Sequence, residues 1–243
     1  MKALTRSCGP VVAFMLLLVA RPVSGQPAVA PPGATKIAEN DMVVVWETAW
    51  VKGKPTASWE RRFDQLVVTL EEGAIRVSRP DKSTMVEQLK VGGVRFESKG
   101  TVSSEEGLSE RPARAVIVAF KSYTPPSLDP KVAQQLKDAK AKGIPGQLPR
   151  KGAVQLFENE HFSVWDNAWP LGPPQDEHVH YKYAVCVFIQ AGTIISTSAG
   201  SEGQPGPGVE RAVGYVNVGS PRGGPHSEGA SKGAPRAIFV EFK

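Results

Sequence analysis

The sequence contains only two cysteines, Cys8 and Cys186, and we expect Cys8 to be removed with an N-terminal leader. A single remaining cysteine excludes a disulfide within the chain, even in an oxidising compartment. Long apolar runs are missing too, because the run at residues 11–20 is about half of the ~20 residues that a membrane-spanning helix needs. No cluster of basic residues and no glycine-rich phosphate-binding motif is visible. These absences argue against a disulfide framework, a stable membrane anchor and nucleic acid as a partner.

Residues 1–25 have the pattern of a secretory signal peptide. Lys2 and Arg6 precede the apolar run, and small residues follow it up to Gly25, where we expect cleavage. The leader also holds Arg21 and no acidic residue, so its removal lowers the net charge from +5 to +2. We therefore predict an exported protein, periplasmic or secreted, whose basic character belongs mostly to the leader.

Glycine and proline are abundant, with 24 and 21 residues, which favours many short strands over long helices. The sequence also contains an internal repeat. The segment ENDMVVVWETAW at 39–50 recurs as ENEHFSVWDNAW at 158–169, an offset of 119 positions, and residues 114–121 match 236–243 at an offset of 122. We predict an all-β protein made of two tandem copies.

The predicted domains are residues 26–121 and 151–243, with residues 122–150 as a linker. Inside the linker, Asp129 is a suitable N-cap and Gly143 a natural stop, which predicts a short helix over 130–142. We interpret this helix as a connector between the copies.

Histidine is scarce, with four residues, and three of them suit a metal site. His178 and His180 are two positions apart, so on a strand both imidazoles point to one face, with Cα atoms roughly 7 Å apart. The proline and glycines of residues 221–226 predict a tight turn that delivers His226 onto a following strand. Three neutral imidazoles are a plausible ligand set for one divalent ion: iron, manganese, zinc or nickel.

The spacing of these residues resembles that of the cupin superfamily. Its first motif matches Gly172-x5-His178-x-His180-x4-Val185-x6-Gly192, and the core of its second motif matches Pro221-x-Gly223-x2-His226. The resemblance implies a double-stranded β-helix, a jelly-roll barrel, in each copy, with a metal ion bound inside the second. The family's glutamate ligand falls on Val185 and its usual asparagine after the second motif falls on Ala230. Some cupin dioxygenases work with three histidines and no carboxylate.

The first copy has no histidine at these places. The offsets put Trp59, Arg61 and Leu66 opposite His178, His180 and Val185, and Ser104 opposite His226. Trp59 and Arg61 are predicted to fill the barrel or stack on each other. An anion pocket at Arg61 is the alternative interpretation.

Other residues receive weaker predictions. If Val185 points into the barrel, Cys186 lies on the opposite face and is not a ligand. For the loop at 197–208, covering the barrel mouth and forming a solvated connection are both open. The remaining side chains of interest are His161 as packing, the repeated Trp46, Trp50, Trp165 and Trp169 as core, Lys182 and Tyr183 near the barrel mouth, and Glu177 and Glu228 as carboxylates without an assigned role.

Three hypotheses of function follow. The first is an exported metal-dependent bicupin enzyme, dioxygenase- or isomerase-like, in which His178, His180 and His226 hold the ion and a small polar or anionic molecule is the substrate. The second is a non-catalytic protein that binds a metal or small ligand. The third is a structural pair of barrels with relic histidines, associating as a homodimer through strand edges.

Overall fold

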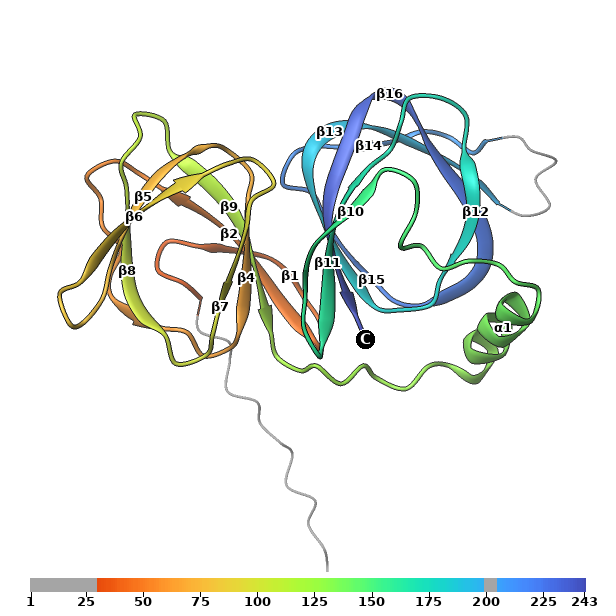
Figure 1. Cartoon of the computed structure of the whole chain (residues 1–243), viewed down its shortest axis with the longest axis horizontal. Helices are drawn as coiled ribbons and strands as arrows, with labels where there is room; N and C mark the ends of the chain where they lie inside the picture. The colour runs from red at the N-terminus through yellow and green to blue at the C-terminus, as the bar shows by residue number, and fades with distance from the viewer. Residues whose placement is uncertain (1–29, 199–204) are drawn as a thin grey trace, which may run out of the picture.

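The computed structural model of the protein describes residues 30–198 and 205–243 (Figure 1). The predicted signal peptide and residues 199–204 of the glycine-rich loop lie outside these ranges. The described residues fold into two β-barrels that lie side by side, joined by a linker with one helix. The all-β prediction is confirmed. No helix of the described ranges is long and apolar enough to cross a bilayer.

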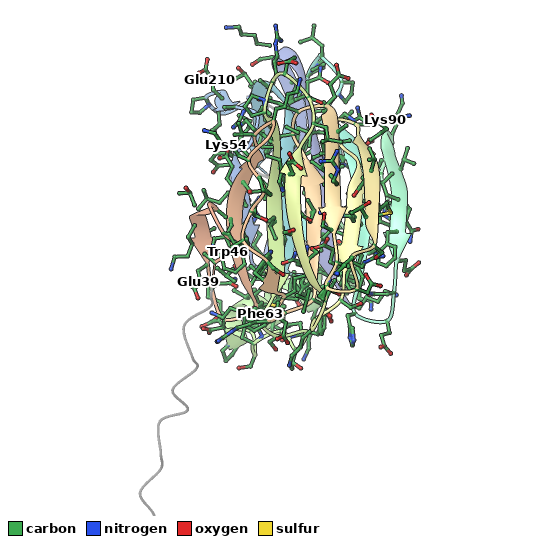
Figure 2. All side chains as sticks on the ribbon, turned by 90° about the vertical axis from the view of Figure 1, so that its left-hand side faces the viewer. Glu39, Trp46, Lys54, Phe63, Lys90 and Glu210 are labelled. Atoms are coloured by element: carbon green, nitrogen blue, oxygen red, sulfur yellow. The ribbon has the colours of Figure 1, made fainter. Side chains whose placement is uncertain are left out.

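The first barrel consists of a five-stranded sheet, in the order β1-β2-β9-β4-β7, and a four-stranded sheet, in the order β3-β8-β5-β6. All pairings within these sheets are antiparallel. Charged side chains such as Glu39, Lys54 and Lys90 project from its surface (Figure 2). Its strands are β1 (Thr35–Glu39), β2 (Val43–Trp50), β3 (Trp59–Glu60), β4 (Gln65–Thr69), β5 (Gly73–Ser78), β6 (Thr84–Leu89), β7 (Val94–Glu97), β8 (Val102–Gly107) and β9 (Ala113–Phe120).

The second barrel is a single seven-stranded sheet in which two long strands bend around the interior. The main path is β10-β11-β16-β13-β14, while β12 pairs with β16 and β15 pairs with β13. Its strands are β10 (Ala153–Glu158), β11 (Phe162–Ala168), β12 (Gln175–His180), β13 (Ala184–Ser198), β14 (Val209–Arg211), β15 (Val216–Gly219) and β16 (Arg222–Phe242).

Glycines lie within both long strands, and the turn predicted at residues 221–226 is wrong. Gly192 lies inside β13, and a Cβ at this position would come within 2.5 Å of Pro235 Cδ, so the glycine permits close packing rather than a turn. Likewise, no tight turn precedes His226, because β16 begins at Arg222. A Cβ on Gly223 would lie 2.3 Å from Gln135 Cβ, which shows that this glycine allows the linker helix to approach the strand.

The linker helix α1 (Pro130–Ala141) forms where the sequence predicts it. The Asp129 side chain accepts hydrogen bonds from the backbone N–H groups of Lys131 and Val132 and so caps the first turn. Leu136 and Ala139 are buried. The connecting helix therefore also packs against β16, the strand that carries His226.

The strand registers support the internal duplication and correct one of its alignments. Asn40 Oδ1 accepts hydrogen bonds from the backbone two and three residues later, and Asn159 Oδ1 does the same in the second copy. However, Trp59 pairs with Ser103 where His178 pairs with His226. The residue equivalent to His226 is therefore Ser103, not Ser104, because β8 is related to β16 by an offset one larger than that of β9.

A hydrophobic cluster between the barrels holds them together, and aromatic rings of both barrels, such as Phe120 and Phe162, stack at 4.7 Å between ring centroids. Burial of apolar side chains from both partners is the main source of stability for such an interface. Representative members are Leu66, Val118 and Phe120 from the first barrel and Phe162, Val185 and Val240 from the second.

Val185 does not point into the second barrel, so the condition attached to the placement of Cys186 does not hold. Val185 is fully buried in the cluster between the barrels, whereas Ala184 and Cys186, on the other face of β13, line the barrel interior. Strand alternation fixes this choice once one of the three residues is placed. A carboxylate at position 185 could not reach the histidines.

Candidate metal centre

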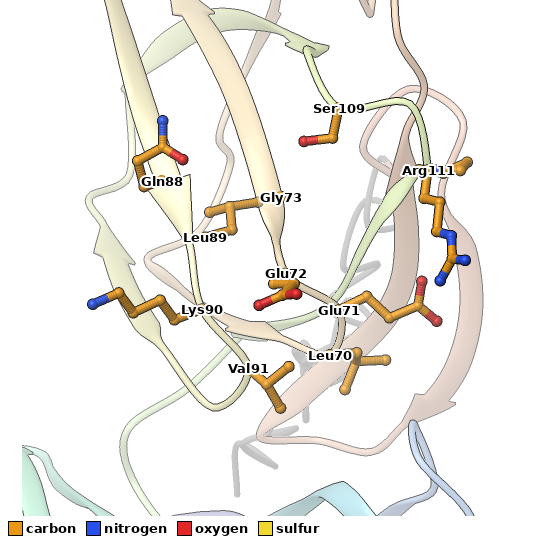
Figure 3. Close-up of a pocket in the computed structure, with 11 residues that line it drawn as sticks. Leu70, Glu71, Glu72, Gly73, Gln88, Leu89, Lys90, Val91, Ser109 and Arg111 are labelled. Carbon is orange, nitrogen blue, oxygen red and sulfur yellow. The ribbon is translucent and has the colours of Figure 1, made fainter.

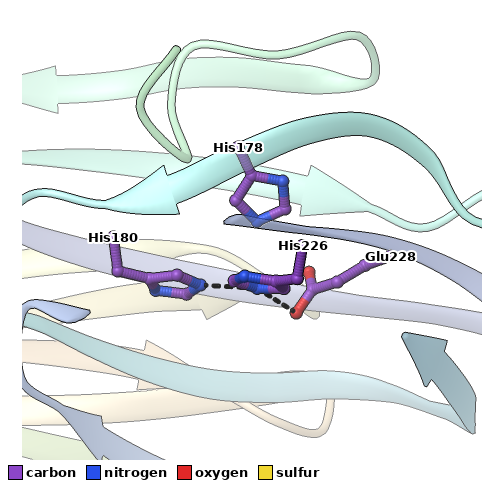
Figure 4. Close-up of side chains that lie close together, drawn as sticks. All are labelled: His178, His180, His226 and Glu228. Atoms are coloured by element: carbon purple, nitrogen blue, oxygen red, sulfur yellow. Dashed lines mark hydrogen bonds and ion pairs between the residues drawn. The ribbon is translucent and has the colours of Figure 1, made fainter. Parts of the chain in front are cut away.

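Three histidines and one glutamate converge inside the second barrel (Figure 4). His178 and His180 project from β12, and His226 and Glu228 from the neighbouring antiparallel β16, where His226 pairs with His178. Side chains two positions apart share one face of a strand, so two such pairs on adjacent strands bring four groups together. One ligand atom from each residue lies within 4.8 Å of all the others. The structure thus brings the three predicted histidines together and adds Glu228.

The sequence interpretation left Glu228 without a role, although the spacing contains the signal. His226-x-Glu228 repeats the i, i+2 pattern of His178-x-His180. To recognise this pattern, one must know that β16 runs without interruption from Arg222 past Glu228. The turn predicted at residues 221–226 implied the opposite.

Backbone carbonyls set the tautomers of two of the imidazoles. His178 Nδ1 lies 2.9 Å from the carbonyl oxygen of Asp176, and His226 Nδ1 lies 3.1 Å from that of Gly224. Because a carbonyl only accepts, each Nδ1 must carry the proton and each Nε2 keeps a lone pair directed into the cluster. The buried Nε2 of His178 has no hydrogen-bond partner among the described residues.

The third imidazole also presents a lone pair. His180 Nε2 lies 3.2 Å from Arg222 Nη2, which can only donate, and 3.1 Å from His226 Nε2. His180 Nε2 therefore accepts from Arg222, and the Nε2 atoms of His180 and His226 lie 3.1 Å apart with no hydrogen between them. A metal ion would satisfy both of these atoms and also the unpartnered Nε2 of His178.

Glu228 is held with one oxygen toward the histidines. Its Oε2 accepts hydrogen bonds from Trp169 Nε1 at 2.9 Å and from Arg150 Nη1 at 3.2 Å, while Oε1 lies 3.7 Å from His226 Nε2. Burial alone would raise the pKa of this carboxyl, but the charge of Arg150 and the hydrogen bond from Trp169 act against burial, and the pKa lies well below its usual range. Glu228 is thus an ionised ligand group supported by a second layer of donors.

The histidines of β12 are neutral near pH 7. Burial lowers the pKa of His178 to about 4 and that of His180 to about 3, and the charge of Arg222 acts in the same direction on His180. Neutral imidazole is the form that binds a metal ion.

The distances fit a single first-row metal ion. Two nitrogen ligands at about 2.1 Å from one ion lie roughly 3.0 Å apart at right angles and about 4.2 Å apart when opposite. The 3.1 Å and 3.7 Å separations at His226 lie within that range, and the widest spread of 4.8 Å requires only a small inward movement. One carboxylate and three imidazoles form a donor set that iron, manganese, zinc and nickel all accept.

A cavity of about 220 Å³ opens beside the cluster. His180 and Glu228 form part of its wall, and Lys182, Arg211 and Arg222 place three cations around it. Lys182, for which a place near the barrel mouth was considered, lines this cavity while remaining partly exposed, and its ammonium is paired with Glu241 at 2.8 Å. The remaining wall includes Trp169, Cys186, Phe188 and Phe239.

Cys186 faces this cavity, but its thiol is not activated as a nucleophile. Complete burial raises the pKa of its thiol far above the ordinary value, so it stays protonated at neutral pH. Cys186 is not one of the four clustered residues, and it lies on the cavity side of β13 because Val185 points the other way.

At the equivalent place, the first barrel is filled by an ion-pair network. Arg61 is 1% exposed, contacts Glu97, Glu105 and Ser103, and lies over the Trp59 ring at 5.1 Å. The predicted packing of Trp59 and Arg61 is confirmed, and the anion pocket has no room, because the remaining cavity is about 10 Å³. Trp50 donates to Glu105 just as Trp169 donates to Glu228, which marks the two glutamates as equivalents.

A larger hollow lies elsewhere, as an open groove of about 1010 Å³ on the first barrel (Figure 3). Glu71, Glu72, Lys90 and Arg111 lie along it among apolar residues. None of the described residues lining it is a histidine or a cysteine, and the metal-ligating cluster lies in the other barrel. Its size therefore does not make it the candidate centre.

The remaining predicted residues have structural positions. His161 stacks on Tyr123 with ring centroids 4.0 Å apart, so the packing interpretation is confirmed. Trp46, Trp50 and Trp169 are buried, as expected for core residues, whereas Trp165 is only partly buried at the edge of a core cluster. Tyr183 packs against the cluster between the barrels, away from the mouth, and Glu177 is exposed on β12.

No protein-family model and no curated protein sequence matches this chain. Solved structures do match it over most of its length. An oxalate decarboxylase aligns with a TM-score of 0.56 and 12% identity, over 88% of this chain and 74% of the other. A salicylate 1,2-dioxygenase from Pseudaminobacter salicylatoxidans aligns with a TM-score of 0.54 and 11% identity, over 86% and 76%. A cupin 2 conserved barrel domain protein from Leptotrichia buccalis aligns with a TM-score of 0.51 and 12% identity, over 86% and 88%.

Proposed function

Because the chain has the two-barrel cupin fold, we propose that its second barrel is a mononuclear metal centre that acts on a small anionic molecule. His178, His180, His226 and Glu228 would hold the ion. The observation that carries this proposal is the convergence of three imidazole lone pairs and one carboxylate oxygen, with the buried Nε2 of His178 otherwise unpartnered.

The ion would supply Lewis acidity or, if it is iron or manganese, redox chemistry. Other residues of the chain would orient the groups that hold the ion. Arg150 and Trp169 keep Glu228 oriented, and the carbonyls of Asp176 and Gly224 keep two imidazoles in the ligating tautomer. This support holds the centre rigid, which favours a defined geometry at the open coordination positions.

The cavity indicates the class of molecule. Its volume of about 220 Å³ accommodates only a small compound, and Lys182, Arg211 and Arg222 give it positive character. A small carboxylate that chelates the ion is the substrate class that this surface favours. The oxalate decarboxylase and salicylate dioxygenase of similar fold make decarboxylation and oxygen insertion the first reactions to examine.

A direct test is to reconstitute the metal-free protein with iron, manganese, zinc or nickel and screen small aliphatic and aromatic carboxylates for turnover. The proposal expects one metal to support product formation, detected by chromatography together with oxygen uptake, and the Glu228→Gln variant to be inactive. Absence of turnover with every metal, despite stoichiometric binding, would contradict the enzyme assignment.

One observation favours a non-catalytic alternative. Among the described residues lining the cavity, Glu228 is the only carboxylate, and it is placed as a ligand. Lys182 is paired with Glu241, so no separate general base is visible. A protein that stores or senses a metal or a small anion fits this arrangement, and it would bind carboxylates without converting them.

Export to the periplasm or medium belongs to the proposal and rests on the leader-like residues 1–25. Association of two copies through strand edges is a further hypothesis. N-terminal sequencing of the mature protein recovered from its producing cells would test export. Sedimentation of the mature protein would test association of two copies.

A further inference from the structure

Arg222 occupies a position that the metal centre leaves unexplained. It is the first residue of β16, four residues before His226, and its side chain lines the cavity next to the cluster. In the described part of the chain its one side-chain hydrogen bond is to His180, from Nη2 to Nε2 at 3.2 Å. A guanidinium that donates to a prospective ligand atom competes for that atom.

An imidazole nitrogen has one lone pair, so His180 Nε2 can accept from Arg222 or bind a metal ion, but not both. The competition is also electrostatic. With the ion bound, a unit positive charge would remain within a few ångströms of a divalent ion inside a partly buried site, where screening is weak. Metal binding must therefore release Arg222 from His180.

The released side chain has one suitable destination. Arg222 already lines the cavity of about 220 Å³ and is otherwise exposed, so a small rotation turns its guanidinium toward the cavity. A carboxylate bound on the open side of the ion would be its nearest anionic partner, since the only carboxylate in the described cavity wall, Glu228, is already engaged by Arg150 and Trp169. Guanidinium and carboxylate form a two-pronged pair that suits this role.

We propose that Arg222 couples metal loading to anion binding: it takes the place of the metal cation at His180 in the metal-free protein and pairs with the bound carboxylate in the loaded protein. The inference rests on the proposed metal centre and deepens it. Because binding couplings are reciprocal, the anion must strengthen metal binding through Arg222 by the same factor as metal strengthens anion binding.

Arg211 provides a matched control from the same cavity wall. Its guanidinium lies over the Tyr215 ring at 4.5 Å and the Phe188 ring at 5.9 Å, and it makes no hydrogen bond to a ligand histidine within the described residues. Removing the Arg211 guanidinium changes the charge of the cavity but leaves the hydrogen bond at His180 Nε2 unchanged.

The experiment is calorimetric titration of the full-length mature chain with Co²⁺, with and without acetate, for the wild type, Arg222→Ala and Arg211→Ala. Without acetate, Arg222→Ala is expected to bind Co²⁺ roughly tenfold or more tightly than wild type, because a competing and repelling cation is gone. Arg211→Ala should remain within about threefold of wild type. Acetate should tighten Co²⁺ binding by the wild type and by Arg211→Ala more than by Arg222→Ala.

Equal or weaker Co²⁺ binding by Arg222→Ala, with a wild type that binds, would overturn the inference and identify Arg222 as a support for His180. Failure of the wild type itself to bind Co²⁺ would instead remove the metal centre, so the two failures are distinguishable. Thermal unfolding of each variant verifies folding, which the exposed position of Arg222 should leave intact.

Discussion

Glu228 and Glu105 are equivalent residues that two copies of one fold use differently. Each accepts a hydrogen bond from a buried tryptophan, Trp169 or Trp50, but the first faces three histidines and the second faces Arg61 and Arg95. A few side chains, and not the backbone, decide which barrel can hold an ion.

The first prediction concerns the donor that orients Glu228. Replacing Trp169 with Phe keeps the ring but removes the N–H that bonds Oε2 at 2.9 Å. We expect metal affinity to fall about 10- to 100-fold, the usual effect of losing a supporting hydrogen bond. Competition of the protein with a metal chelator measures this, and Trp50→Phe, the same change in the first barrel, should leave metal affinity unaltered. Equal losses in both variants would contradict the assignment.

The second prediction concerns the buried arginine of the first barrel. Arg61 neutralises Glu97 and Glu105, and burial already raises the pKa of Glu105 despite the charge of Arg95. Arg61→Met should therefore lower the free energy of unfolding by about 3–5 kcal/mol, because it leaves buried carboxylates short of a partner. Urea denaturation provides the measurement. Arg76→Ala, which breaks a more exposed pair with Glu106, should cost less than about 1 kcal/mol.

The third prediction is a pH dependence of the metal-free protein. Burial lowers the pKa values of His178 and His180 to about 4 and about 3 from an ordinary 6.5. Between these values the unfolded chain binds more protons than the folded one, so stability is complete above about pH 6.5 and declines as the pH falls toward 4. Urea unfolding at a series of pH values, with chelator present, should show this decline. His178→Gln should flatten it, whereas an unchanged slope would rule out the burial effect.

At the scale of elements, the long strand β16 connects the fold to the site. Its first residues pack under α1 through Gly223, the next carry His226 and Glu228, and its last residues belong to the cluster between the barrels. One continuous strand thus connects the linker helix, two residues of the candidate metal cluster and the interface between the barrels.

The fourth prediction tests the close approach of α1 to this strand. A Cβ at Gly223 would lie 2.3 Å from Gln135 Cβ and 3.1 Å from the backbone nitrogen of Leu136, so Gly223→Ala must displace the helix. We expect a loss of about 1–3 kcal/mol of stability, the usual result of overpacking. Thermal unfolding tests it against Gly224→Ala, where nothing lies within 4 Å of the added atom and the change should be small. Indistinguishable variants would mean that α1 is not docked as described.

Strand alternation, helix capping and internal repetition predicted much of this from the sequence. The capping of α1 by Asp129, the duplication and the convergence of His178 with His180 are local patterns, and local patterns can be seen in a sequence. The inward face of β13 and the uninterrupted course of β16 depend on bulges and on packing against distant elements, which a sequence does not display. These features explain why the sequence did not reveal the orientation of Val185 or the role of Glu228, and why Ser104 instead of Ser103 was aligned with His226.

At the scale of the whole molecule, the two barrels share one apolar interface, to which Val185 belongs. The fifth prediction follows: Val185→Glu should lower the free energy of unfolding by about 3 kcal/mol or more, because it buries an unpaired carboxylate. It should add no ligand to the metal centre. Ala184→Glu, which points into the cavity, should cost less, and denaturant unfolding compares the two. Tighter metal binding by Val185→Glu would contradict the orientation of β13.

The central claim is that one barrel of the two holds one metal ion, and the metal content of the purified protein tests it most directly. The mature chain, prepared without a metal-binding tag, should contain about one equivalent of a divalent metal by mass spectrometry after reconstitution and desalting. Glu105→Gln, altered in the first barrel, should keep that equivalent, and the double variant His226→Gln/Glu228→Gln should lose it. A wild type without bound metal, or a double variant that retains it, would contradict the account.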